Sequence, residues 1–148
     1  MSGDGCSRLA EACAVVAART ASPREFLRRL GHEVAGVRRG LFWPVDAGSG
    51  GSNRIRGRGF RRHVDDGTDG QARHFAGMVA VAARIGTRPT RWLAIHVGRD
   101  APDSADGRLT EHALDFVRLI RSGELATTDT DAWVRRTICE QGSGLTSR

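Results

Sequence analysis

The stretch from residue 65 to residue 86 constrains the fold more than any other part of the chain. A polar loop, DDGTDG, leads directly into QARHFAGMVAVAARIG, the most apolar helical pattern in the sequence. Gly86 supplies a terminator, so the pattern predicts a helix over residues 70–85. We expect this helix to be the hub of the core. Its inward face consists of residues at helical spacing: Phe75, Met78, Val79, Ala82 and Ala83.

The sharpest local signal in the chain is the sequence SPRE at residues 22–25. Ser22 offers an N-cap hydroxyl, Pro23 suits the first helical position and Glu25 stands three residues after the cap. Together they satisfy the exposed amide groups of a helix start. We expect the helix that follows to end at Gly40, because glycine is the usual terminator.

Four further segments carry apolar residues at helical spacing, and we expect helices there. For one of them, residues 90–96, a strand is an open alternative. We expect Asp103 or Asp106 to cap one of the later helices and Thr128 to cap the last. The four segments are residues 7–20, 90–96, 108–121 and 129–139.

These patterns define the fold class. The chain has 148 residues, which suits one domain with one buried core. No internal repeat is visible, so solenoid architectures are excluded. We expect a mainly α protein, a small irregular bundle of four to six helices in a single domain.

Composition divides the chain into four parts. Residues 1–45 form a helical hairpin followed by an apolar tether, LFWPV. Residues 46–62 have the Gly/Ser and then Arg/Gly composition of a linker, which we expect to be loosely ordered. Residues 63–140 form the core helical region, and residues 141–148 are a flexible tail.

The formal net charge of +6 is concentrated in the first half of the chain. Residues 1–64 carry twelve arginines against five acids, whereas residues 65–148 carry eleven against twelve. All the basic residues are arginine, whose planar guanidinium pairs with phosphate and carboxylate groups. The same composition is typical of GC-rich genomes, so the charge alone does not identify a partner.

The basic residues are densest in RIRGRGFRR, residues 54–62. Short Arg/Gly tracts of this kind follow phosphates, and Phe60 could stack on a nucleobase. We expect this segment to contact an anionic partner, either an acidic protein or a nucleic acid, although an ordinary solvated linker has the same composition. The candidate anion-binding residues are Arg54, Arg56, Arg58, Arg61 and Arg62.

The polar loop before the central helix is the other candidate site. Asp65, Asp66 and Asp69 precede His74 within ten positions, and an imidazole oriented by a carboxylate is what a hydrolytic site requires. A simpler interpretation is that Asp69 caps the helix and that His74 is a hydrogen-bonded core residue. No metal site is expected, because the loop lacks the bidentate glutamate of a calcium-binding loop.

The three cysteines, Cys6, Cys13 and Cys139, have no metal-ligand spacing and are odd in number. We expect reduced thiols in a cytoplasmic protein, with no cofactor. The longest uncharged run outside the first helix is residues 75–83, far short of the roughly 20 residues that a membrane span needs. We therefore expect no membrane association.

The sequences DDGTDGQARHFAGMVA and LTEHALDFVRLIRSGEL together resemble small bacterial helical proteins of uncharacterised function. In these, a polar loop enters a helix beginning Arg-His-Phe, and a later helix holds an Asp-Phe pair. The resemblance covers roughly residues 60–140 and implies only that the loop and His74 form a recurring local structure. Our leading hypothesis is a non-enzymatic binding module. The alternative is a small hydrolase or toxin-like enzyme built around His74.

Overall fold

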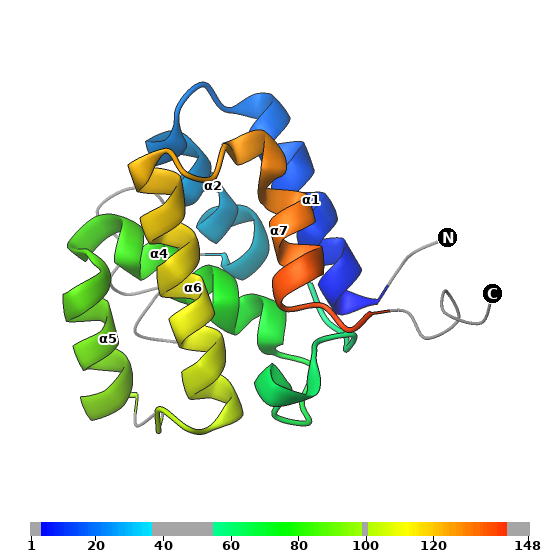
Figure 1. The fold of residues 1–148 in the computed structure, drawn as a ribbon, viewed down its shortest axis with the longest axis vertical. Coiled ribbons are helices and arrows are strands. Elements are labelled where there is room, and N and C mark those ends of the chain that lie inside the picture. The colour runs from blue at the N-terminus through cyan, green and yellow to red at the C-terminus, as the bar shows by residue number, and fades with distance from the viewer. Residues whose placement is uncertain (1–3, 37–54, 99–100, 142–148) are drawn as a thin grey trace.

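The central helix expected from the sequence runs through the middle of the molecule (Figure 1). The structure is a computed structural model, and it describes residues 4–36, 55–98 and 101–141. Within these ranges the chain is mainly helical and forms one domain, as the sequence predicted. The α-helices are α1 (Gly5–Arg19), α2 (Pro23–Ala35), α4 (Gln71–Ile85), α5 (Thr87–His96), α6 (Ala105–Ser122) and α7 (Thr130–Thr137), and the 3-10 helices are η1 (Arg62–Val64) and η2 (Thr127–Asp129).

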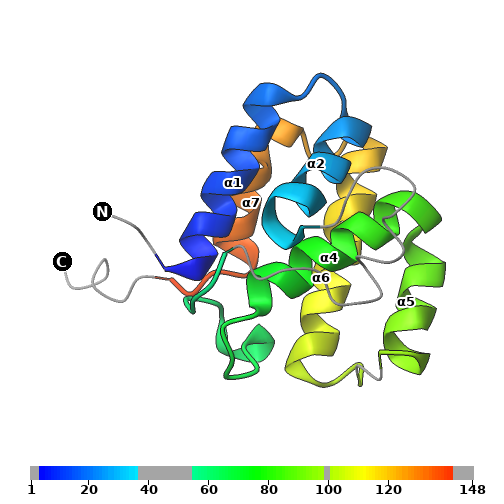
Figure 2. The same cartoon turned by 180° about the vertical axis from the view of Figure 1, so that it is seen from behind.

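Helix α4 packs most extensively against α2 and α6, while α1 packs against α7 on the other side of the domain. Figure 2 shows α2 and α4 crossing at the back of the molecule. Phe75, Val79 and Ala82 are fully buried, which confirms most of the predicted inward face of α4, whereas Met78 is only partly buried. The contact with α2 is close because Gly31 lies against Ala80, where a Cβ on Gly31 would stand 2.5 Å from the methyl carbon of Ala80.

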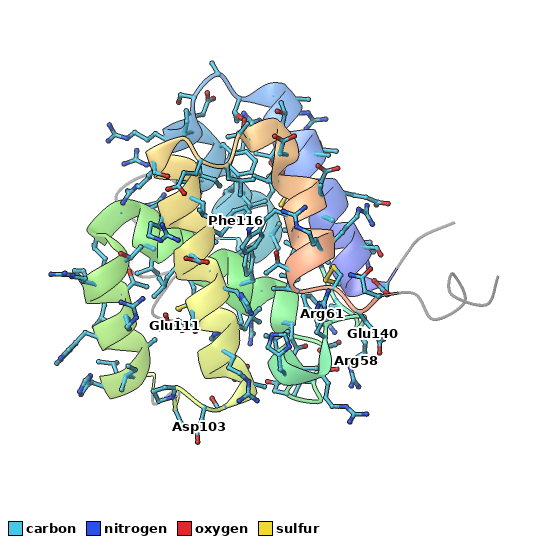
Figure 3. The ribbon with its side chains drawn as sticks, in the orientation of Figure 1. Arg58, Arg61, Asp103, Glu111, Phe116 and Glu140 are labelled. Atoms are coloured by element: carbon cyan, nitrogen blue, oxygen red, sulfur yellow. A yellow bond between two sulfur atoms is a disulfide. The ribbon has the colours of Figure 1, made fainter. Side chains whose placement is uncertain are left out.

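Four aromatic rings fill the interior between α2, α4, α6 and α7. Phe116 lies at their centre, with its ring centroid 5.2 Å from that of Phe75 and 5.1 Å from that of Trp133. Phe26 completes the group at 6.3 Å from Phe116. Figure 3 shows Phe116 in the middle of the domain. Aromatic residues are few in this chain, and these four lie where the four helices meet.

The helix boundaries follow local capping chemistry, but several predicted caps are wrong. Thr128 does not cap the last helix, because it lies within η2 and the N-cap of α7 is Asp129. Ser22 caps α2, because its hydroxyl accepts a hydrogen bond from the Glu25 amide. This helix ends at Gly36, in the left-handed conformation, and not at Gly40 as predicted. Helix α6 is capped by Ser104, whose hydroxyl accepts from the Gly107 amide, so neither predicted aspartate is the cap.

The ends of the helical domain are joined by a disulfide between Cys6 and Cys139. The expectation of reduced thiols is therefore wrong for these two residues. Their separation of 133 residues leaves no local motif, and the packing of α1 against α7 is what brings them together. Cys13 is free and buried, and burial raises the pKa of its thiol to about 12, so it stays protonated at neutral pH.

The segment 55–61, part of the predicted linker, is an ordered strap between the two ends of the chain. The Cys6 amide donates to the carbonyl oxygen of Arg58 (3.1 Å), and the Arg61 amide donates to that of Ile138 (2.9 Å). Composition predicted a loose segment here, but backbone hydrogen bonds do not depend on composition. Residues 46–54 of the predicted linker, the apolar tether and residues 142–148 of the tail lie outside the described residues. No helix in the described ranges is long and apolar enough to cross a membrane.

Alanine substitutions at two glycines test the packing of α4 against α2. Gly31→Ala should lower the free energy of unfolding by about 1–3 kcal/mol, because its Cβ has no room against Ala80. Gly77→Ala is the matched control, since Gly77 lies in α4 with no atom within 4 Å of the added Cβ. It should raise the free energy of unfolding by about 0.5–1 kcal/mol through helix propensity. Urea denaturation measures both changes, and equal effects would contradict the close α2–α4 contact.

The disulfide should stabilise the fold by constraining the unfolded chain. Replacing both Cys6 and Cys139 by Ser should lower the free energy of unfolding by about 2–5 kcal/mol and Tm by on the order of 10 °C. Thermal denaturation with and without reductant measures the loss. Alkylation without reductant should modify no cysteine in the folded protein and Cys13 alone after denaturation. Three modified thiols in the unreduced, denatured protein would contradict the bond.

Candidate functional site

The predicted anion-binding arginines lie on the strap and on η1, beside the disulfide. Two of them make hydrogen bonds to other residues of the protein. Arg58 donates to Asp65 Oδ2 through both Nε (3.2 Å) and Nη2 (2.8 Å), and this pairing raises the pKa of Arg58 above its ordinary value. Arg61 donates to the carbonyl oxygen of Arg136 on α7 (2.6 Å). Figure 3 shows Arg58 and Arg61 near the C-terminal end of α7.

Arg56 and Arg62 are exposed, so their guanidinium groups face solvent. Arg54 lies outside the described residues. A cavity of about 330 Å³ opens beside the strap. It combines two arginines with two carboxylates, so its own lining is close to neutral. The lining residues are Arg58, Gly59, Phe60, Arg62, Asp65, Gly67 and Glu140.

Phe60 does not serve the role predicted from the sequence. Its side chain is 3% exposed and belongs to the hydrophobic core, and its backbone pairs with Cys139 in an isolated antiparallel bridge. The ring has no open face on which a nucleobase could stack. An aromatic residue among arginines and glycines can either stack on a base or pack into the core and hold the segment there. The sequence pattern does not distinguish the two.

The acidic loop, residues 65–70, is held by its own side chains. Asp65 Oδ1 accepts from the Gly67 amide (2.9 Å) and Asp66 Oδ1 accepts from the Thr68 amide (2.9 Å). Asp69 is exposed and does not cap α4, whose N-cap is Gly70 without a side-chain hydrogen bond. The capping prediction is therefore wrong, and the carboxylates serve mainly to fix the loop.

Asp66 is the most constrained of these carboxylates. Burial alone would raise its pKa, but hydrogen bonds from Thr68 and Gln71, together with one shared with the Asp106 carboxyl, outweigh that cost and hold the pKa of Asp66 below its usual range. Gln71 donates its side-chain amide to Asp66, while the buried amide oxygen of Gln71 finds no hydrogen-bond partner within the described part of the chain. These contacts join the loop to the starts of α4 and α6.

His74 lies one turn further along α4, on the side that faces α6. Its Nε2 is 2.8 Å from Oγ1 of Thr110, which is itself buried. His74 does not line the cavity beside the strap. The structure thus gives His74 a hydrogen bond to a core hydroxyl. Among the described residues, no group of three His, Cys, Asp or Glu side chains could hold a metal ion.

A pair of imidazoles lies between η1 and α6 that the sequence analysis did not bring together. Nε2 of His63 is 3.1 Å from Nε2 of His112, and the two rings meet edge to face. Burial lowers the pKa of both, helped by the charge of Arg108 at His63 and by His63 itself at His112. No spacing signal could reveal this pair, because 49 residues separate its members.

The fold and these sites define a small helical domain with a basic strap across its joined ends. Comparison of the chain with protein-family models, with curated proteins and with solved structures found no match. The functional argument therefore depends on the residues of this chain alone.

The imidazole pair predicts a pH dependence of stability. Because the pKa of His63 and His112 is lower in the folded protein than in the unfolded chain, proton binding favours unfolding. The contribution of the pair to the free energy of unfolding should be fully present above the unfolded-state pKa of about 6.5. It should be lost as the pH falls from that value through the lower pKa values of the folded protein. Urea midpoints measured between about pH 8 and pH 5 give the slope.

The variant His112→Gln should flatten that slope, since it removes one imidazole and the charge repulsion at the other. His96→Gln is the control, because His96 lies on α5 and its replacement leaves the pair in place. A slope that is the same in the native protein and in His112→Gln would show that other groups govern the acid loss of stability.

Proposed function

We propose that the protein is a non-enzymatic binding module that contacts an anionic partner through its strap. The observation that supports this most is the exposure of Arg56 and Arg62 on either side of a stretch, residues 58–61, that backbone hydrogen bonds hold to the folded domain. An ordered segment presents its charges without the entropic cost of ordering a loose one. The strap surface, defined here as Arg56, Arg62, Arg135 and Arg136, is the proposed contact region.

Helix α7 adds two of these arginines. Arg135 and Arg136 are exposed in its last turn, and the hydrogen bond from Arg61 to the Arg136 carbonyl places that turn beside the strap. Arg58 is excluded from the proposed surface, because Asp65 already neutralises it. Four exposed guanidinium groups, from the strap, η1 and α7, then form a cationic area, whose attraction to a polyanion is screened by salt.

Both partner classes predicted from the sequence, an acidic protein and a nucleic acid, present anionic groups to such a surface. Because Phe60 is buried, base stacking makes no part of the proposal. The interaction is expected to use phosphate or carboxylate oxygens only, and hence to read no base sequence. The relative affinities for duplex DNA and for polyglutamate, measured at the same salt concentration, distinguish the two classes.

The alternative function is a small hydrolase or toxin-like enzyme with His74 as its acid or base. One observation favours it, the group of polar side chains that joins Asp66 to Asp106 and His74 to Thr110 between α4 and α6. It requires that a substrate reach His74, whereas the cavity beside the strap is lined by other residues. We therefore rank the binding function first.

The disulfide also bears on where the protein acts. The expectation of a cytoplasmic location depended on reduced thiols, and the bond between Cys6 and Cys139 removes that support. Disulfides persist in oxidising compartments and are rare in the reducing cytosol. We propose an oxidising compartment in place of the cytoplasm.

The double variant Arg56→Gln/Arg62→Gln tests the strap surface. It should elute from heparin at lower salt and bind duplex DNA or polyglutamate about tenfold more weakly at low ionic strength, because two charged contacts are lost. For DNA, the slope of log affinity against log salt should fall by about 2. The control Arg19→Gln/Arg88→Gln removes the same charge from exposed positions on α1 and α5. If both variants lose affinity equally, net charge and not the strap governs binding.

A further inference from the structure

A second cavity lies at the other end of α4 from the acidic loop. It has a volume of about 510 Å³ and is formed where the start of α2 meets the last turns of α4 and α6. A 15-residue helix is roughly 22 Å long, and α4 has that length, so this cavity is well separated from the strap. Its lining residues are Ser22, Pro23, Arg24, Leu27, Arg28, Ala83, Arg84 and Arg121.

The charge of this arginine pocket is of one sign. Four of its eight described lining residues are arginine, and none of the eight is Asp or Glu. The cavity beside the strap differs, because there carboxylates accompany the arginines. A concave site lined by cations alone concentrates positive potential and attracts anions.

Two of the four guanidinium groups are held in place by helix α4. Arg84 donates through Nη1 to the carbonyl oxygen of Ala80 (3.1 Å), and Arg121 of α6 donates through Nη2 to that of Ala83. A guanidinium has five N–H donors, so one such bond orients the Arg121 group without using its other donors. The cations at this side of the pocket are therefore positioned before any ligand arrives.

Among the described residues, Arg28 contributes to the pocket a buried hydrogen-bond donor that has no acceptor. Its Nε atom is buried, and it has no hydrogen-bond partner among the described residues, which is costly for a charged group. Its charge also acts on a neighbour, since burial and the proximity of Arg28 lower the pKa of Arg84 below its ordinary value. An anion placed between the two would relieve both effects.

The helix macrodipole favours the positions of only two of the four arginines. Arg84 and Arg121 lie in the last turns of their helices, where a cation is favoured by the macrodipole. Arg24 lies in the first turn of α2 together with Glu25, and Arg28 lies one turn further along. The macrodipole disfavours a cation in that first turn and favours an anion there, so a bound anion would add to the stabilisation that Glu25 provides.

We propose that the arginine pocket binds the oligophosphate group of a small molecule, with Arg24, Arg28, Arg84 and Arg121 contacting its oxygens. Each phosphoryl group carries up to about two negative charges at neutral pH, so two adjacent groups match four guanidinium ions. Guanidinium also suits phosphate through its bidentate geometry. The site goes beyond the proposed function and does not depend on the strap.

Calorimetric titration at constant ionic strength tests the proposal on the full chain with its disulfide intact. Pyrophosphate and tripolyphosphate should bind, and orthophosphate should bind at least about tenfold more weakly, because it engages fewer guanidinium groups. ATP distinguishes the source of the phosphates. If ATP binds at least as tightly as tripolyphosphate, the ligand is a nucleotide. If it binds more weakly, the ligand is a free oligophosphate.

The double variant Arg24→Gln/Arg28→Gln should weaken pyrophosphate binding by at least about tenfold. The control Arg88→Gln/Arg118→Gln removes the same charge from exposed positions on α5 and α6 outside the pocket lining, and it should change pyrophosphate binding by less than about twofold. Arg24→Gln alone, at an exposed position, keeps the test valid if the double variant unfolds, and it should weaken binding at least about threefold. Equal losses in the two double variants, orthophosphate binding as tightly as pyrophosphate, or no detectable binding would each overturn the proposal without affecting the strap.

Discussion

The close packing of α4 against α2 is the contact on which the rest of the structure depends. Gly31 and Ala80 allow these two helices to approach one another, and α6 covers the other side of α4 with Phe116. The acidic loop and the arginine pocket lie at opposite ends of this one helix. The length of α4 therefore fixes the distance between the strap side of the molecule and the pocket side.

Patterns that act within one helix could be predicted from the sequence. The apolar face of α4 was predicted from residues at helical spacing, and Phe75 and Val79 are buried accordingly. The cap of α2 followed from Ser22 and Glu25, because its hydrogen bonds form within one turn. Such signals need no knowledge of the tertiary fold. The helical class of the protein depends on them, and it was predicted correctly.

Features that join distant segments could not be predicted. The disulfide spans 133 residues, the histidine pair spans 49, and the arginine pocket combines side chains from three helices. The strap was misjudged for a related reason, since glycine and arginine composition carries no information about backbone hydrogen bonds to the chain ends. Within the candidate sites, residue types were informative about chemistry, whereas only the tertiary arrangement decides which side chains meet.

The bond between Cys6 and Cys139 makes nearly the whole polypeptide a closed covalent ring. A protease that cuts any loop inside the ring, such as the turn between α6 and α7, opens the ring but releases no fragment. The two pieces of the nicked molecule stay covalently joined until a reductant breaks the disulfide. Cleavage and loss of the fold are thus separate events in this protein, and the redox state of one bond determines whether the first leads to the second.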